Sequence, residues 1–119
     1  MKILLVEDDE LIRDMIRELL IAQEYGIECC SSAEAALVVA EKFKPDVVVT
    51  DVNLGPGLTG LQFGAELRRR QPTVGIVYVS GVSDHLADRV FETPDRFLAK
   101  PFRVKDLLQA IEAVRRSTP

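Results

Sequence analysis

Short apolar runs alternate along the chain with longer segments in which apolar residues recur at helical spacing. The runs are rich in β-branched and aliphatic residues, which favour strands, and they occupy residues 2–7, 27–31, 46–51, 74–80 and 96–100. The segments 8–26, 31–45, 60–72 and 103–117 have the pattern of helices. Because connections between parallel strands cross a face of the sheet, we expect an α/β fold: a doubly wound, five-stranded parallel sheet with helices on both faces.

Helix signals refine this picture. The first predicted helix has apolar residues at helical spacing, namely Leu11, Ile12, Met15, Ile16, Leu19 and Leu20. The last has a single apolar face formed by Val104, Leu107, Leu108, Ile111 and Val114. The second helix begins with a capping-box pattern, Ser31 followed by Glu34, and has to end near Pro45. The segment 81–95 has few apolar positions, so we expect no more than a short helix there, capped by Ser83.

The composition is that of a single globular domain. A chain of 119 residues, 47% hydrophobic and 29% charged, can bury one conventional core, and we expect one domain over residues 1–119. The net charge of −4 and the lack of tryptophan argue against binding to nucleic acid or anionic membranes. No apolar stretch reaches the length of a membrane span. The adjacent Cys29 and Cys30 are poorly placed for a disulfide, so we expect free thiols in a reducing cytoplasm.

Polar residues with complementary chemistry follow four of the predicted strands. In open α/β sheets, ligands bind outside the carboxyl ends of the strands. The residues at these ends are Glu7, Asp8 and Asp9, then Asp51, then Ser80, then Lys100. Each alone is explained by helix capping or turn formation. Independent capping would not supply acids, a hydroxyl and an ammonium together, so the set predicts a functional site.

The chemistry of this set favours phosphoryl transfer. Several carboxylates close together remain ionised only if a cation offsets their charge. Oxygen ligands without histidine or cysteine select a hard divalent ion, for which we expect Mg²⁺. A carboxylate beside Mg²⁺ can act as a nucleophile toward phosphorus and form an aspartyl-phosphate. Lys100 would then neutralise part of the charge on the transferred group.

These residues resemble a known family, the receiver domains of two-component response regulators, to which the chemotaxis regulator CheY belongs. The resemblance is carried by "ILLVEDDE", "VVVTD", "YVS" and "FLAKPF", and it covers nearly the whole chain. It implies a flavodoxin-like sheet with the strand order 2-1-3-4-5. It also implies that the protein is a switch that acquires a phosphoryl group, rather than an enzyme with a separate substrate.

The resemblance assigns the acidic residues. Asp51 would accept the phosphoryl group from a phosphohistidine on a sensor histidine kinase or a histidine phosphotransfer protein. Glu7, Asp8 and Asp51 would hold Mg²⁺ together with the backbone carbonyl of Asn53. Asp9 lies one place beyond the acidic pair of the family, and we expect it to cap the following helix.

The resemblance also assigns residues near the last two strands. Ser80 takes the place of the switch hydroxyl that moves onto the phosphoryl group, and Phe97 takes the place of the switch aromatic. Lys100, in "FLAKPF", corresponds to the lysine that receivers of the family have at this position, and the resemblance implies that it takes part in catalysis. The Lys100–Pro101 bond is expected to be cis, as in the family.

Two features depart from the usual pattern of the family. Receivers usually have a proline four residues and a glycine eight residues after the phosphoacceptor, whereas this chain has Gly55 and Thr59 there. The proline and the glycine of this chain, Pro56 and Gly60, each come one residue later than in the family. The loop is therefore expected to be one residue longer. The stretch between Ser80 and Lys100 is also short, similar to a subgroup of stand-alone or kinase-linked receivers with a reduced fourth helix.

Three functions are compatible with the residues themselves. A phosphorylation switch acting through protein contacts, as a monomer or weak dimer with no effector domain in this chain, uses every member of the set. Met1 of this chain stands directly before the first predicted strand, which favours a natural amino terminus. A phosphatase of the haloacid dehalogenase type would need an acid where the chain has Asn53, and an amide cannot perform acid–base catalysis. A receiver-like module that binds partners without phosphorylation would not need the intact set.

Overall fold

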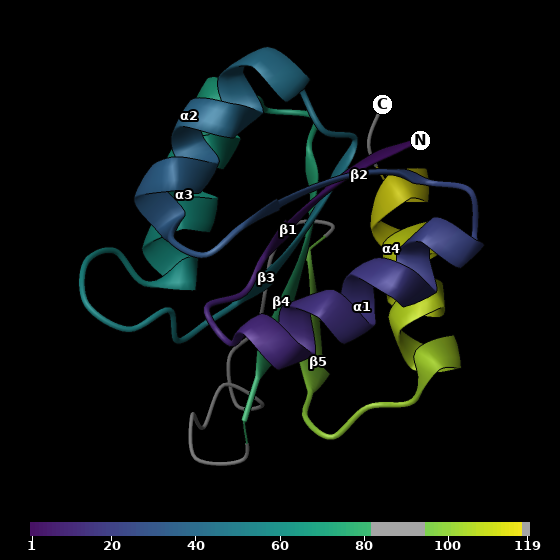
Figure 1. Cartoon of the computed structure of the whole chain (residues 1–119). Coiled ribbons are helices and arrows are strands. Elements are labelled where there is room, and N and C mark those ends of the chain that lie inside the picture. The colour runs from purple at the N-terminus through teal and green to yellow at the C-terminus, as the bar shows by residue number, and fades with distance from the viewer. Residues whose placement is uncertain (82–94, 118–119) are drawn as a thin grey trace.

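The computed structural model describes residues 1–81 and 95–117. A central sheet is covered by helices on both faces, α2 and α3 on one and α1 and α4 on the other (Figure 1). The elements are β1 (Lys2–Val6), α1 (Glu10–Ala22), β2 (Gly26–Cys30), α2 (Ala33–Phe43), β3 (Val47–Asp51), α3 (Gly60–Arg70), β4 (Gly75–Ser80), β5 (Arg96–Ala99) and α4 (Val104–Ser117). The predicted fold class is confirmed.

All neighbouring strands of the sheet are parallel, and their order is β2-β1-β3-β4-β5, as the resemblance implied. The register pairs Asp51 with Val79, and Ser80 with Ala99. Because the strands run in the same direction, their carboxyl ends meet at one edge of the sheet. Residues that are far apart in the sequence are therefore brought together at that edge.

Two hydrophobic clusters lie on the two faces of the sheet, and this explains why the central strands are predominantly apolar before their carboxyl ends. Leu4 and Val6 of β1 pack toward α2 and α3, whereas Ile3 and Leu5 pack toward α1 and α4. Every residue of β3 and β4 is buried. The strands that deliver Asp51 and Ser80 are thus buried along their whole length.

Two helix caps differ in how well they were predicted. Asp9 caps α1, as expected, because its Oδ1 accepts a hydrogen bond from the Ile12 amide at 3.0 Å. The capping box predicted from Ser31 and Glu34 is wrong: α2 is capped by Ser32, whose Oγ accepts from the Ala35 amide at 3.2 Å. The chain needs one more residue to turn out of β2, so the helix begins later than the pattern indicated.

The apolar stripes of α1 and α4 are wider than the surfaces they bury. Ile16 and Leu20 of α1 are buried as predicted, and so are Leu107, Ile111 and Val114 of α4. Leu11, Met15 and Val104 instead remain 72%, 59% and 42% exposed. Met15 and Val104 line an apolar groove between α1 and the start of α4, whereas Leu11 lies on α1 outside it.

Three further predictions concern the thiols, membrane spans and the segment after Ser80. Cys29 and Cys30 are free thiols, as predicted. No helix among residues 1–81 and 95–117 combines the length and the apolar character needed to cross a bilayer. The short helix expected after Ser83 lies outside the described residues.

Candidate functional site

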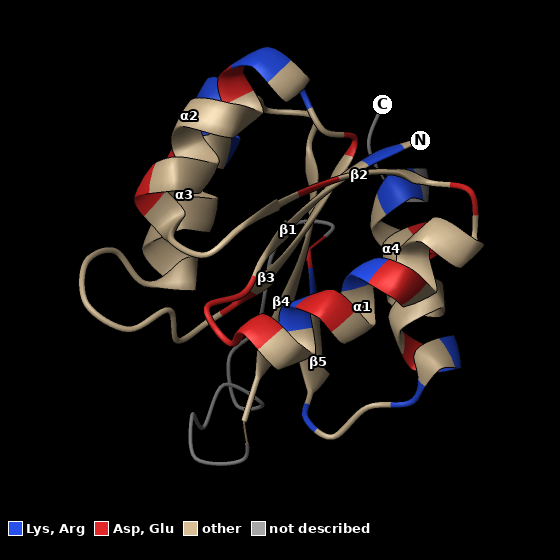
Figure 2. Ribbon diagram, in the orientation of Figure 1, with Lys and Arg blue, Asp and Glu red and all other residues tan. Residues whose placement is uncertain are grey.

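The acidic residues predicted for the site lie where β1 leads into α1 and where β3 ends, at the carboxyl edge of the sheet (Figure 2). A shallow hollow of about 310 Å³ opens at this edge. It is lined by Glu7, Asp8, Asp9, Ile12, Asp51, Asn53, Gly81 and Lys100. The strand ends singled out in the sequence therefore converge, apart from Ser80, which does not line the hollow.

Lys100 lies between two of the carboxylates. Its Nζ is 2.9 Å from Asp51 Oδ2 and 3.7 Å from Glu7 Oε2. Carboxylate oxygens of Glu7, Asp8 and Asp51 lie within 4.8 Å of one another. Glu7 and Asp51 are buried, whereas Asp8 is exposed. The site thus combines three acids with a single adjacent ammonium group.

The electrostatics of the cluster follow from burial and from the like charges. Burial, and then the nearby charge of Asp51, raise the pKa of Glu7 from 4.5 to about 7. Burial alone would lower the pKa of Lys100, but the hydrogen bond and charge of Asp51, together with Glu7, outweigh it and raise this pKa. Lys100 therefore stays protonated at neutral pH and offsets only part of the negative charge.

The raised pKa of Glu7 predicts how stability varies with pH when divalent cations are removed. Between pH 4.5 and about 7 the folded state retains a proton that the unfolded state has released, so the free energy of unfolding falls as pH rises through this window. We expect wild type to lose roughly 1 to 3 kcal/mol relative to Glu7→Gln between pH 4.5 and pH 8. Urea denaturation in chelated buffer measures this difference, and parallel pH profiles would contradict it.

Backbone amides fix the two buried carboxylates. The Asn53 amide donates to Asp51 Oδ1 at 3.2 Å, and the Asp9 amide donates to Glu7 Oε1 at 3.2 Å. Arg13, on the first turns of α1, donates from Nη1 to the Glu7 carbonyl at 3.1 Å. The two amide bonds set the direction of the Asp51 and Glu7 carboxylates, and the Arg13 bond holds the backbone of Glu7.

The remaining residues predicted for the site lie on β4 and β5 or directly after β5. Ser80 is fully buried, and its Oγ is 3.4 Å from the Gly81 carbonyl. The Lys100 amide donates to the Ser80 carbonyl at 2.7 Å, which joins the ends of β4 and β5. Phe97 is half-buried against the cluster beneath α2 and α3. The Lys100–Pro101 bond is cis, as predicted.

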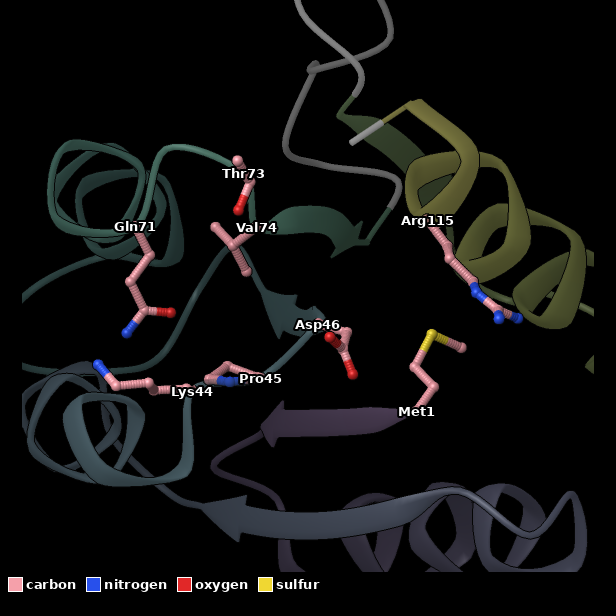
Figure 3. A pocket seen from close by; sticks show the side chains of 8 residues that line it. All are labelled: Met1, Lys44, Pro45, Asp46, Gln71, Thr73, Val74 and Arg115. Atoms are coloured by element: carbon pink, nitrogen blue, oxygen red, sulfur yellow. The ribbon is translucent and has the colours of Figure 1, made fainter. Parts of the chain in front are cut away.

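A larger cavity lies at the opposite end of the sheet. It has a volume of about 590 Å³ and is lined by Met1, Lys44, Pro45, Asp46, Gln71, Thr73, Val74 and Arg115 (Figure 3). Its acid is already engaged, because Asp46 Oδ2 accepts from the Lys2 amide at 2.8 Å. It contains no cluster of carboxylates, so size alone does not identify the functional site of this chain.

The donor set at the acidic hollow suits a hard cation. Among the described residues, Glu7, Asp8 and Asp51 form the one group of acids, histidines and cysteines placed to share a metal ion. All three offer oxygen ligands, which Mg²⁺ prefers, and a divalent cation would relieve the repulsion that raises the pKa of Glu7. The residues present therefore fit a divalent metal.

Comparison with known proteins decides the family. The family described as "Response regulator receiver domain" matches residues 3–112. The chain belongs to this family of receiver domains. The prediction made from "ILLVEDDE", "VVVTD" and "FLAKPF" is thus confirmed, and it places the chain in two-component signalling.

Individual relatives agree with the assignment. The receiver domain is 32% identical to the response regulator MprA of Mycobacterium leprae over 99% of this chain and 52% of that protein. It is 29% identical to the positive alginate biosynthesis regulatory protein of Pseudomonas aeruginosa, over 98% of this chain and 48% of that protein. The chain therefore spans about half the length of these curated relatives.

Solved structures share the fold. The receiver domain superposes on the chemotaxis response regulator CheY4 of Vibrio cholerae with a TM-score of 0.80, at 27% identity over 95% of this chain and 97% of that one. A response regulator receiver domain protein from Clostridium thermocellum gives a TM-score of 0.82, at 27% identity over 97% of this chain and 94% of that one.

The sequence did not predict every residue that shapes the site of this receiver domain. Ile12 and Gly81 line the hollow. Arg13 supports Glu7 by donating a hydrogen bond to the Glu7 backbone carbonyl. Glu34 contacts the loop after Asp51, although 24 residues separate it from its partner Leu58. The spacing in the sequence gives no signal for such contacts, because they arise only when α1 and α2 dock on the sheet.

Proposed function

We propose that this receiver domain is a phosphorylation-dependent switch in which Asp51 accepts a phosphoryl group from a phosphohistidine in a sensor kinase or phosphotransfer protein. The observation that carries the proposal is the contact of Lys100 Nζ with Asp51 Oδ2 at 2.9 Å, beside two further acids. A buried carboxylate at a strand end, held by one amide and one ammonium, is suited to in-line attack on phosphorus.

In the proposed reaction, a carboxylate oxygen of Asp51 forms a bond to phosphorus while the phosphorus–nitrogen bond of the donor breaks. The electron pair of that bond returns to the imidazole, which takes up a proton. Lys100, which balances the Asp51 carboxylate before transfer, then pairs with a phosphoryl oxygen. Hydrolysis by water later restores the carboxylate and releases inorganic phosphate.

Glu7, Asp8, Asp51 and the carbonyl of Asn53 would hold Mg²⁺, which supplies positive charge to the equatorial oxygens of the phosphoryl group. The shared hollow and the spacing of the three carboxylates support this ligand set. Asp8, which is exposed, and the buried Glu7 and Asp51 would each supply a carboxylate oxygen to the ion.

The switch would operate through the end of β4 and the surface of β5. Ser80 directly precedes Gly81, which lines the hollow. Rotation of the Ser80 side chain would bring its hydroxyl to a phosphoryl oxygen. The half-buried Phe97 would respond to that rearrangement and change the surface offered to a downstream protein. Output through protein contact accords with a net charge of −4.

The apolar groove beside the site supports a protein as phosphodonor. It is lined by Ile12, Met15, Ile16, Leu19, Gly81, Lys100, Pro101, Phe102 and Val104, and it encloses about 570 Å³. It shares Ile12, Gly81 and Lys100 with the acidic hollow. A donor that covers exposed Met15 would therefore bring its phosphohistidine directly over Asp51.

Incubation with Mg²⁺ and either acetyl phosphate or an aryl phosphate tests the proposal against its alternatives. A switch retains one phosphoryl group per chain from acetyl phosphate, detected by intact mass, and releases aryl alcohol only at the slow rate of its own dephosphorylation. A phosphatase turns over the aryl phosphate without a retained group. No retained group and no turnover with any donor would leave binding without phosphorylation as the function.

A further inference from the structure

The connection between Asp51 and α3 is anchored firmly at both ends. At its start, the Val52 amide donates to the Val79 carbonyl at 2.9 Å, and Leu54 is buried. At its end, Thr59 and Gln62 form a capping box, and the Gly60 amide donates to the Val52 carbonyl at 2.8 Å. Residues 54–58 must therefore bridge two fixed points.

The middle of this connection contains the residues with the greatest conformational freedom. Gly55 and Gly57 have φ values of 77° and 96°, in the region that glycine alone adopts readily. A Cβ atom at Gly55 would lie 3.6 Å from Asp8 Oδ2, so the loop passes directly beside the acidic cluster. The conformation of the loop therefore determines what surrounds Asp8 and how Asn53 is presented.

Glu34 holds this middle part in place from α2. Its Oε2 accepts a hydrogen bond from the Leu58 amide at 2.9 Å, which lowers the pKa of Glu34. Within residues 1–81 and 95–117, this is the one hydrogen bond made by residues 54–58. A Cβ atom at Gly57 would lie 2.6 Å from the same carboxylate oxygen, so the carboxylate rests against the loop at two consecutive residues.

We propose that Glu34 is a positioning residue, which holds residues 54–58 beside Asp8 so that Mg²⁺ binding and phosphoryl uptake both depend on it. This inference rests on the proposed function of Asp51. The two glycines of the loop leave many conformations open, and the contact with Glu34 selects the one that closes on the acids. Without it the loop must be ordered at the moment of binding, which weakens binding.

The test compares Glu34→Ala with Glu34→Gln and with Glu41→Ala. Glutamine keeps an oxygen that accepts from the Leu58 amide. Glu41 is exposed on the same helix, and its side chain makes no hydrogen bond or ion pair within the described part of the chain, so its replacement removes the same charge without releasing the loop. Three quantities are measured for each: Mg²⁺ affinity by calorimetry, the rate of phosphoryl uptake from acetyl phosphate, and hydrogen exchange of the Leu58 amide.

For Glu34→Ala we expect Mg²⁺ affinity and uptake rate each to fall by about tenfold, the lower end of the range found when groups that support metal ligands are removed. The Leu58 amide should exchange about tenfold faster, and the melting temperature should fall by no more than about 5 °C, the effect of losing one exposed hydrogen bond and one acid from the first turn of α2. Glu34→Gln should remain within about twofold of wild type in all three.

The failures of the two proposals can be told apart. If wild type neither binds Mg²⁺ nor accepts a phosphoryl group, the proposed function fails and the inference fails with it. If wild type does both, and Glu34→Ala equals Glu41→Ala in affinity, rate and amide exchange, the inference alone is overturned. A fall in melting temperature without a change in affinity would assign Glu34 a structural role and would also overturn it.

Discussion

Replacing Lys100 with methionine is expected to slow phosphoryl uptake at Asp51 by about a hundredfold or more, the usual cost of removing one preorganised donor from a charge-stabilising site. Methionine keeps much of the length of the side chain but removes the ammonium 2.9 Å from Asp51 Oδ2. The rate is measured from intact mass during incubation with acetyl phosphate and Mg²⁺.

The same variant should bind Mg²⁺ at least as tightly as wild type, because Lys100 repels a cation placed among the acids. Affinity and rate should therefore change in opposite directions. Lys105→Met is the matched control, since Lys105 is exposed on α4 away from the hollow. Unchanged uptake by Lys100→Met, or an equal loss in Lys105→Met, would contradict the role given to Lys100.

Gly60→Ala is expected to destabilise the fold by about 3 kcal/mol, at the upper end of the usual cost of overpacking. A Cβ atom at Gly60 would lie 1.9 Å from the Asp51 carbonyl oxygen and 2.9 Å from Val52 Cα. Both obstacles are backbone atoms, so no rotation of a side chain can relieve the clash. The end of β3 must move away from α3, and Asp51 moves with it.

Urea denaturation measures the loss of stability, and phosphoryl uptake by the folded fraction measures the displacement of Asp51. Gly26→Ala adds the same methyl group in β2, where the nearest atoms are 3.8 and 3.9 Å away. That control should change stability by no more than about 0.5 kcal/mol. Equal stability of the two variants would contradict the clash inferred at Gly60.

The alternation of apolar runs and helical segments was sufficient to predict the sheet, since strands buried on both faces leave a continuous apolar signature. The polar residues at strand ends were equally informative, because parallel topology carries Glu7, Asp51 and Lys100 to one edge whatever the loops do. The match to the receiver family confirms the family resemblance that these strand ends carried. Local chemistry and strand direction together therefore identify the candidate site.

Features that depend on the docking of helices were not predictable in the same way. The periodic pattern placed Met15 and Val104 on packing faces, but the width of the sheet decides which part of a stripe is covered. Glu34 was assigned to a capping box, whereas its carboxylate reaches a loop that no local pattern could bring near. The glycines of that loop were visible in the sequence, but its contact with Glu34 was not.

The central claim is that Asp51 is the phosphoacceptor of a receiver domain. Intact-mass analysis of wild type and Asp51→Asn, each incubated with acetyl phosphate and Mg²⁺, tests it most directly. The asparagine variant keeps the shape of the side chain and removes the nucleophilic carboxylate. We predict one added phosphoryl group on wild type and none on the variant, with the wild-type signal abolished by a chelator. An equal mass increase on both proteins, or none on wild type with any donor, would contradict the claim.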